Sequence, residues 1–311
     1  MTTRRRPPGR RAKPARIPAA EWLLLAAVLL AGALLRVWIL QRTSGLTMDS
    51  PLYVGMAARL GHVLPPLGPA HHGYPALVAA ASALIPGHEW PGRIVSLVAG
   101  LALIALTWAL ARRRVPAWGA AAAAGLVALH PLLALSSGTV MTEASFQAIT
   151  YASLLVLDLG RTLPAAGLMG IAYWVRPEAM VIAAAALPAL QSWRRRAAWV
   201  LVFVVAAIPE VAMLSAERGT FTLTPKTNLV AAAGAAQDDA EWHAAADSTA
   251  PPMSAAEWIR RGLPAAAARY PDRLMGQLAR VHQTWPLPLV LLSVLGACLR
   301  PGLLLAPLAI L

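Results

Sequence analysis

The apolar part of the chain begins with WLLLAAVLLAGALLRVWIL, residues 22–40, and a polar stretch, residues 41–93, follows it. About 20 residues at 1.5 Å rise each cover the hydrocarbon core of a bilayer, so residues 22–40 predict a membrane-spanning helix. A signal peptide is the alternative, because basic sequence precedes the apolar run. The run is long for a signal peptide, however, and no small-residue cleavage site follows it. The polar stretch is therefore expected to lie directly beyond a membrane span.

The composition extends this interpretation to the whole chain. Hydrophobic residues make up 58% and charged residues 13% of the 311 residues, and the mean hydropathy is +0.58. These values favour a membrane protein over a soluble domain. We expect an all-α fold, a polytopic transmembrane helical bundle over residues 22–311. The only cysteine, Cys298, excludes an intrachain disulfide and a cysteine metal cluster.

The net charge of +13 is concentrated in clusters at residues 4–16, 112–114 and 194–196. Arg-rich short loops stay on the cytoplasmic side during insertion. The clusters therefore predict a multi-pass protein of the plasma membrane with a cytoplasmic N-terminus. We expect residues 1–21 to form a disordered basic tail, and we expect membrane lipids rather than nucleic acid as partners.

The other apolar runs predict further spans at about residues 93–111, 118–135, 143–158, 163–175, 179–193, 197–215, 287–299 and 302–311. Residues 41–92 and 216–285 would then be large extracytoplasmic loops. Residues 74–85 are too few to cross a bilayer and predict an interfacial helix. His130-Pro131 should kink the third span. Because the chain stops inside apolar sequence, we expect either a truncated chain or a short member of its family.

Four charged residues, Asp49, Glu143, Arg176 and Glu178, fall on the extracytoplasmic side in this topology. Charges near membrane depth are costly and usually face a cavity or each other. Asp49 is the candidate catalytic base, and a helix N-cap is its alternative role. Glu143 is a candidate assisting acid or metal ligand, or an acid that is favourable for a helix dipole.

Arg176 suits a phosphate ligand because guanidinium groups match phosphate oxygens bidentately; a structural pair with Glu178 is the alternative. His71 and His72 are candidates for metal or phosphate contact, or are simply interfacial polar residues. A divalent metal is thus a possible cofactor without an assigned ligand set. Arg36 near the end of the first span is expected either to snorkel or to pair with an acid.

Nucleotide-driven transport and hydrolase chemistry lose support, since the chain has no Walker loop, GxSxG elbow, HExxH or dinucleotide fingerprint. The acids Asp238, Asp239 and Glu241 are expected to form a solvated face, with acceptor binding as the alternative.

Several short motifs occur in a characteristic order: Arg36, Asp49-Ser50-Pro51-Leu52-Tyr53, His72-Gly73-Tyr74-Pro75, Arg93, Thr142-Glu143, Trp174-Val175-Arg176-Pro177-Glu178 and Asn228. This order resembles the GT-C glycosyltransferases, particularly bacterial relatives of the protein O-mannosyltransferases and of the aminoarabinose-lipid A transferases. The amphipathic residues 255–285 are similar to the family's second large outer loop.

The resemblance implies a multispan helical fold and inverting transfer of a monosaccharide, a hexose such as mannose, from a polyprenyl-phosphate donor to a lipid, glycan or protein acceptor. It implies Asp49 as the base. Together with the match between guanidinium and phosphate, this leads us to expect a donor-phosphate site made of Arg176, Arg93 and His72. The residues expected to support or line the cavity are Arg36, Tyr53, Tyr74 and Glu178. Met48 and Ser50 flank Asp49 where many relatives have paired acids, which weakens a metal assignment.

Two other functions stay open on the sequence. A transporter or lipid flippase would line its path with Arg36, Arg176 and Glu210. Large asymmetric loops and the lack of an inverted repeat disfavour it. A truncated, non-catalytic relative or scaffold is favoured only by the early end of the chain.

Overall fold

The computed structural model describes residues 18–43, 46–47, 49–60 and 70–225, and isolated positions between 260 and 279. Helices account for the secondary structure of these residues, without strands, which confirms the expected all-α class. The predicted spans 287–299 and 302–311 lie outside the described residues, as do the tail up to residue 17 and most of residues 216–285. Met48, Asn228, Asp238, Asp239 and Glu241 also lie outside them.

Three helices are long and apolar enough to cross a membrane: α1 (Ala19–Arg42), α4 (Glu89–Arg112) and α10 (Trp193–Arg218). They include the predicted spans 22–40, 93–111 and 197–215, each with a few extra residues at its ends. Large apolar side chains on these helices face outward, and Leu23, Val98 and Leu201 are 59–70% exposed. Continuous apolar surfaces of this kind are suited to lipid rather than water. The three helices therefore indicate a membrane protein.

A further apolar stretch, expected from the sequence as the third span, is broken into two helices. Helices α5 (Ala117–Leu129) and α6 (Pro131–Gly138) meet at His130 with a bend of 59°. His130 has an extended backbone, with φ −64° and ψ 122°, because a residue before proline avoids the α region. The expected disruption at His130-Pro131 is confirmed, as a break between two helices rather than a kink within one.

Three shorter helices follow: α7 (Thr142–Asp158), α8 (Thr162–Val175) and α9 (Ala179–Ala186), with a 3-10 turn at Leu187–Ala189. They correspond to the predicted spans 143–158, 163–175 and 179–193. With 8 to 17 residues each, these helices are short for crossing a bilayer, so these crossings stay predictions. Helix α8 packs between α7 and α10, around a core that includes Met169, Tyr173 and Trp199.

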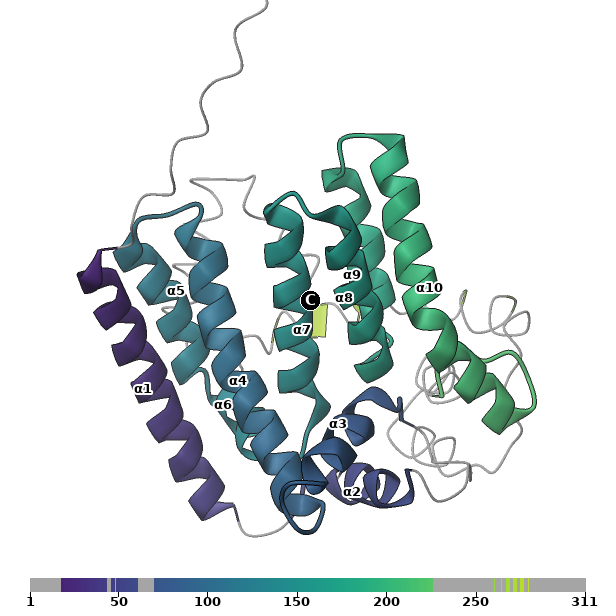
Figure 1. The fold of residues 1–311 in the computed structure, drawn as a ribbon, viewed down its shortest axis with the longest axis horizontal. Coiled ribbons are helices and arrows are strands. Elements are labelled where there is room, and N and C mark those ends of the chain that lie inside the picture. The colour runs from purple at the N-terminus through teal and green to yellow at the C-terminus, as the bar shows by residue number, and fades with distance from the viewer. Residues whose placement is uncertain are drawn as a thin grey trace, which may run out of the picture.

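The two ends of the bundle carry different structures. Two short helices, α2 (Ser50–Arg59) and α3 (Gly73–Ser82), lie across one end of the long helices (Figure 1). Helix α3 is the expected short helix of residues 74–85 and has only 10 residues. At the opposite end, Arg112 pairs with Glu21, and Arg113 and Arg114 pair with Asp158. We refer to these as the α2–α3 end and the opposite end.

Arg36 links α1 to the break between α5 and α6. Its guanidinium is fully buried and donates to the carbonyls of Gly32 (3.1 Å), Ala128 (2.8 Å) and Val127 (3.5 Å). In a continuous helix the last two carbonyls would bond to the amides of residues 131 and 132, but Pro131 has no amide hydrogen. The expectation that Arg36 snorkels or pairs with an acid is therefore wrong, since the carbonyls freed at the break are its partners.

Candidate functional site

Arg176 lies between α8 and α9 at the α2–α3 end of the bundle. It is the C-cap of α8 and has an extended backbone, with φ −152° and ψ 138°. Pro177 follows, and a residue before proline leaves the helical region, so the local sequence ends α8 here. The break places the Arg176 side chain at the end of the apolar helix rather than within it.

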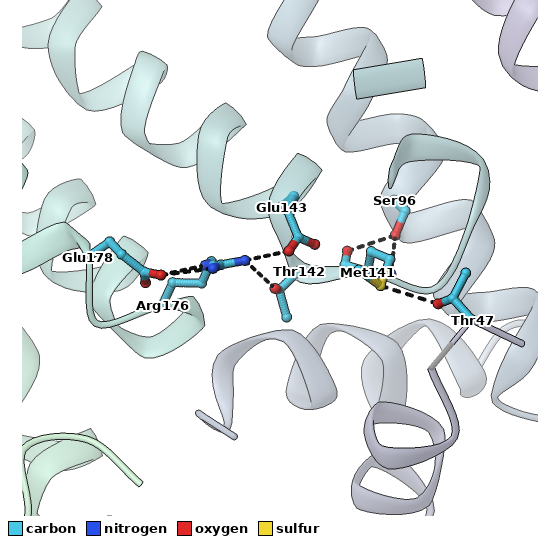
Figure 2. Close-up of polar contacts among 7 residues, drawn as sticks. All are labelled: Thr47, Ser96, Met141, Thr142, Glu143, Arg176 and Glu178. Carbon is cyan, nitrogen blue, oxygen red and sulfur yellow. Dashed lines mark hydrogen bonds and ion pairs between the residues drawn. The ribbon is translucent and has the colours of Figure 1, made fainter. Parts of the chain in front are cut away.

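The Arg176 guanidinium joins three elements (Figure 2). Its Nη1 atom lies 2.5 Å from Oε1 of Glu143 and donates to Oγ1 of Thr142 at 3.3 Å. Its Nη2 atom lies 2.8 Å from Oε1 of Glu178. Glu143 lies in the first turn of α7 and Glu178 is the N-cap of α9. The expected pair with Glu178 is present, and Glu143 is a second carboxylate partner.

A small pocket lies beside this ion-pair cluster. It is lined by Tyr53, Ala70, His71, Thr142, Val175, Arg176 and Pro177. These residues come from α2, from the segment before α3, from the start of α7 and from the α8–α9 break. The pocket thus combines a guanidinium, an imidazole, a phenol and a hydroxyl, all of which can donate hydrogen bonds to an anion.

Tyr53 connects the pocket to Asp49. Burial raises the pKa of the Tyr53 phenol; a hydrogen bond with Thr142 opposes the rise, the Asp49 and Glu143 carboxylates add to it, and Arg176 opposes it. The Tyr53 ring also packs edge-on against Tyr74, with 5.4 Å between centroids. The four polar groups around Tyr53 therefore form one electrostatic neighbourhood.

Asp49 is exposed and lies at the N-cap position of α2, two residues before Pro51. Its side chain makes no capping hydrogen bond. The neighbouring Ser50 is buried instead, and its Oγ donates to the carbonyl of Val140 at 3.0 Å. Asp49 therefore occupies the N-cap position that the sequence predicted, but its side chain does not cap the helix. Its carboxylate is exposed to solvent.

The Gly73-Tyr74 pair docks α3 on the bundle. A Cβ atom on Gly73 would lie 2.6 Å from the backbone carbonyl of Trp174 in α8, so only glycine allows this contact. The fully buried Tyr74 donates its hydroxyl to the carbonyl of Gly92 at 3.0 Å, and this hydroxyl lies 2.8 Å from Oγ of Ser96. Tyr74 packs against Tyr53, which lines the pocket, but Tyr74 itself is not in the pocket lining.

His71 and His72 are buried, with only 3% and 1% exposed, so the expectation of interfacial polar side chains is wrong. The backbone N and the Nδ1 atom of His72 both lie 3.1 Å from Oε1 of Glu210, and its Nε2 lies 2.9 Å from Oε1 of Glu217. Burial lowers the pKa of His72, but its hydrogen bonds and charge interactions with Glu210 and Glu217 outweigh burial and raise the pKa. His72 therefore joins the start of α3 to α10.

Arg93 performs a similar joining role at the start of α4. Its buried guanidinium donates to the carbonyls of Leu40 (3.3 Å) and Thr43 (3.2 Å) and lies 2.8 Å from Oε1 of Glu89. It ties α4 to the end of α1. Of the three residues expected to bind a donor phosphate, Arg176 lines the pocket, whereas Arg93 and His72 do not.

Sequence reasoning missed two contacts of this region, and it named Glu210 only as a charge on a transporter's path. Glu210 is fully buried, and its Oε1 lies between the two histidines. The only signal for it was an acid inside the apolar run of α10, directly after Pro209. His71, rather than His72, lines the pocket, and the sequence offered no means to separate the two. Within the described residues, no group of three or more His, Cys, Asp or Glu side chains has the arrangement of a metal site.

An apolar groove adjoins the pocket between α8, α9 and α10. It has a volume of about 950 Å³, including its open side, and its lining includes Tyr173, Met180, Phe203, Ala207 and Val211. The Tyr173 ring packs edge-on against His71, with 5.2 Å between centroids. The polar pocket and the apolar groove therefore meet at the His71–Tyr173 contact.

Comparisons of the chain with protein-family models, with curated proteins and with solved structures found no match.

Proposed function

We propose that this chain is an integral-membrane inverting glycosyltransferase. It moves a monosaccharide, a hexose such as mannose, from a polyprenyl-phosphate donor to an extracytoplasmic lipid, glycan or protein acceptor. The observation that supports this best is the contact between a guanidinium-lined pocket and an apolar groove. A ligand with an anionic head and a long apolar tail has complementary chemistry to both parts.

In this proposal the donor phosphate binds Arg176 by exchanging with Glu178. Glu178 is the more exposed of the two carboxylate partners, with 49% of its side chain exposed against 34% for Glu143. Exchange keeps the guanidinium paired throughout, as burial of a charge requires. The isoprenoid tail then lies along the groove that contains Tyr173 and Phe203, where it replaces membrane lipid.

Asp49 acts as the base. It removes the proton of the acceptor hydroxyl, whose oxygen attacks the anomeric carbon of the sugar. The bond from that carbon to the phosphate oxygen breaks, and its electron pair goes to the phosphate, which Arg176 stabilises electrostatically. Attack opposite the leaving phosphate inverts the anomeric carbon. Glu143 assists by keeping Arg176 in position.

The membrane arrangement follows the same proposal. The α2–α3 end faces the extracytoplasmic side, and the opposite end, with Arg113 and Arg114, faces the cytoplasm. The positive-inside rule supports this orientation. The short helices α7, α8 and α9 then complete a multi-pass bundle in the plasma membrane.

Two charges on which a transporter would depend have other partners. Arg36 bonds to the carbonyls at the α5–α6 break, and Glu210 lies against the histidines before α3. These contacts support the transferase over a translocation path that runs through Arg36, Arg176 and Glu210.

The test is sugar transfer by the purified protein from radiolabelled polyprenyl-phosphate mannose, and from the glucose analogue, in the presence of lipid, glycan and peptide acceptors. Asp49→Asn should reduce transfer by about 100-fold or more, as expected for loss of a general base. Arg59→Gln is the matched control, because Arg59 is an exposed charge on the same helix, away from the pocket. Full activity of a folded Asp49→Asn protein would remove Asp49 as the base, and a wild-type protein inactive with all donors would argue against the transferase.

A further inference from the structure

His71 is a buried side chain with unused hydrogen-bonding capacity. Only 3% of the residue is exposed, it lines the Arg176 pocket, and within the described residues neither ring nitrogen makes a contact with full hydrogen-bond geometry. Buried polar atoms are nearly always bonded, and an exception calls for an explanation such as a catalytic role or a bound water or ion. The use of His71 is therefore not explained by the packing around it.

Glu210 engages one side of this imidazole. Its Oε1 atom lies 3.2 Å from Nδ1 of His71, which is ion-pair distance, although the contact does not have full hydrogen-bond geometry. The same oxygen accepts from the backbone N of His72, and the other oxygen, Oε2, is buried with no hydrogen-bond partner among the residues that the structure describes. At this distance Nδ1 is the His71 nitrogen that can donate to Glu210. Nε2 is then the nitrogen left for the pocket.

A carboxylate at one imidazole nitrogen determines what the other nitrogen can do. With the Nδ1 proton held by Glu210, neutral His71 offers only a lone pair at Nε2, and protonated His71 offers an N–H donor. An anion in the pocket favours the protonated form, because the imidazolium then lies between two negative groups. Anion binding and proton uptake are thus coupled at this histidine.

We propose that Glu210 and His71 form a carboxylate–imidazole pair that takes up a proton when a phosphate enters the Arg176 pocket, so that Nε2–H becomes a second phosphate donor beside the guanidinium. This inference rests on the phosphate site of the proposed function. His71 contacts the ligand, and Glu210 is a positioning residue that acts through His71.

Other charged and titratable groups are packed around this pair. They are His72 and, through it, Glu217 of α10, Tyr173 of α8, Tyr53 of α2, and the Arg176 cluster with Glu143 and Glu178. His72 is already bonded at both ring nitrogens, so it has no free donor for a phosphate. Comparison of single variants therefore separates His71 from its neighbours.

The experiment is calorimetric titration of the purified full-length protein in detergent with farnesyl phosphate, with farnesol as the uncharged probe. Each titration is run between pH 6 and 9 in two buffers of different ionisation enthalpy, which counts the protons taken up. The free probe has the same ionisation in every titration at a given pH, so the proteins are compared at matched pH. We expect the wild type to prefer farnesyl phosphate, to take up protons on binding, and to bind more weakly as the pH rises.

His71→Gln should weaken binding by about tenfold or more and abolish the additional proton uptake, while farnesol binding stays unchanged. Glu210→Gln should reduce the uptake as well. Arg176→Lys should weaken binding but retain the uptake, and His88→Gln, a histidine change at the N-cap of α4, should match the wild type. If Glu210→Gln unfolds, because it also holds His72, His71→Gln alone decides the question.

The outcomes separate the two proposals. If His71→Gln binds farnesyl phosphate with wild-type affinity and proton uptake, the His71–Glu210 pair is wrong, whereas the Arg176 phosphate site stands. If the wild type never prefers farnesyl phosphate to farnesol, the phosphate site fails and the pair fails with it.

Discussion

Glu143 and Arg176 are 33 residues apart in sequence, and their side chains meet at 2.5 Å. This ion pair joins the first turn of α7 to the break after α8, and Glu178 completes it from the start of α9. Arg176 is thus held between two carboxylates at the rim of a pocket. An anionic ligand has to compete with them for the same guanidinium.

This competition gives the first prediction. Glu178→Gln removes the more exposed competing charge, so farnesyl phosphate should bind the variant several-fold more tightly than the wild type. The reason is that the phosphate no longer has to displace a carboxylate from Nε and Nη2 of Arg176. Calorimetric titration at constant pH measures the change.

Two comparisons support the interpretation of that result. Glu89→Gln, which removes an acid paired with Arg93 outside the pocket, should leave farnesyl phosphate affinity unchanged. Weaker binding by Glu178→Gln would show that Glu178 orients Arg176 for the ligand rather than competing with it, and would contradict the exchange.

The second prediction concerns Arg36. Arg36→Met keeps an unbranched side chain of similar length but leaves the carbonyls of Val127 and Ala128 without a donor at the α5–α6 break. A buried polar group without a partner costs about 1 to 3 kcal/mol, so the variant should lose about that much stability. Thermal unfolding in detergent gives the measurement. Arg42→Met, an exposed arginine at the end of the same helix, is the control, and equal melting temperatures for both variants would remove the structural role of Arg36.

The sequence predicts a feature of this fold well when the residues that determine it lie close together in the chain. The apolar runs and the break at His130-Pro131 are local, because hydrophobic length and proline geometry act within a few residues. The three long apolar helices α1, α4 and α10 and the break at His130-Pro131 agree with the sequence prediction, whereas the shorter spans stay predictions. The shared location of Arg176, Glu143 and Glu178 followed from counting helices, which requires only that the topology is right.

The partners of buried charges, in contrast, are distant in the sequence and could not be predicted from it. Arg36 bonds to a carbonyl 92 residues away, and His72 bonds to a glutamate 138 residues away. Nothing near Arg36 or His72 indicates which distant helix will supply a partner, since that depends on packing between elements. For the same reason, the sequence assigned a phosphate to His72, whereas the structure places His71 at the pocket.

The third prediction tests the docking of α3. Gly73→Ala would place a Cβ atom 2.6 Å from the carbon and oxygen of the Trp174 carbonyl, and backbone atoms cannot move aside as a side chain would. Helix α3 should shift away from α8 and lower the stability by about 1 to 3 kcal/mol, the usual cost of overpacking. The melting temperature should fall accordingly. Gly55→Ala on α2 has open space around its Cβ position and should melt no lower than the wild type, so equal melting of the two variants would contradict the close contact.

The last prediction concerns pH. The pKa of His72 is raised in the folded protein by Glu210 and Glu217, against the opposing effect of burial. A raised folded-state pKa means that the folded state holds the proton more tightly than the unfolded chain. The stabilisation is therefore complete below the unfolded value of about 6.5 and is lost as the pH rises through the folded pKa. Over this range the wild type should lose melting temperature relative to His72→Gln, which cannot titrate there. Parallel pH profiles for the two proteins would show that His72 does not carry the proton, and His88→Gln, at a histidine outside the cluster, should retain the wild-type profile.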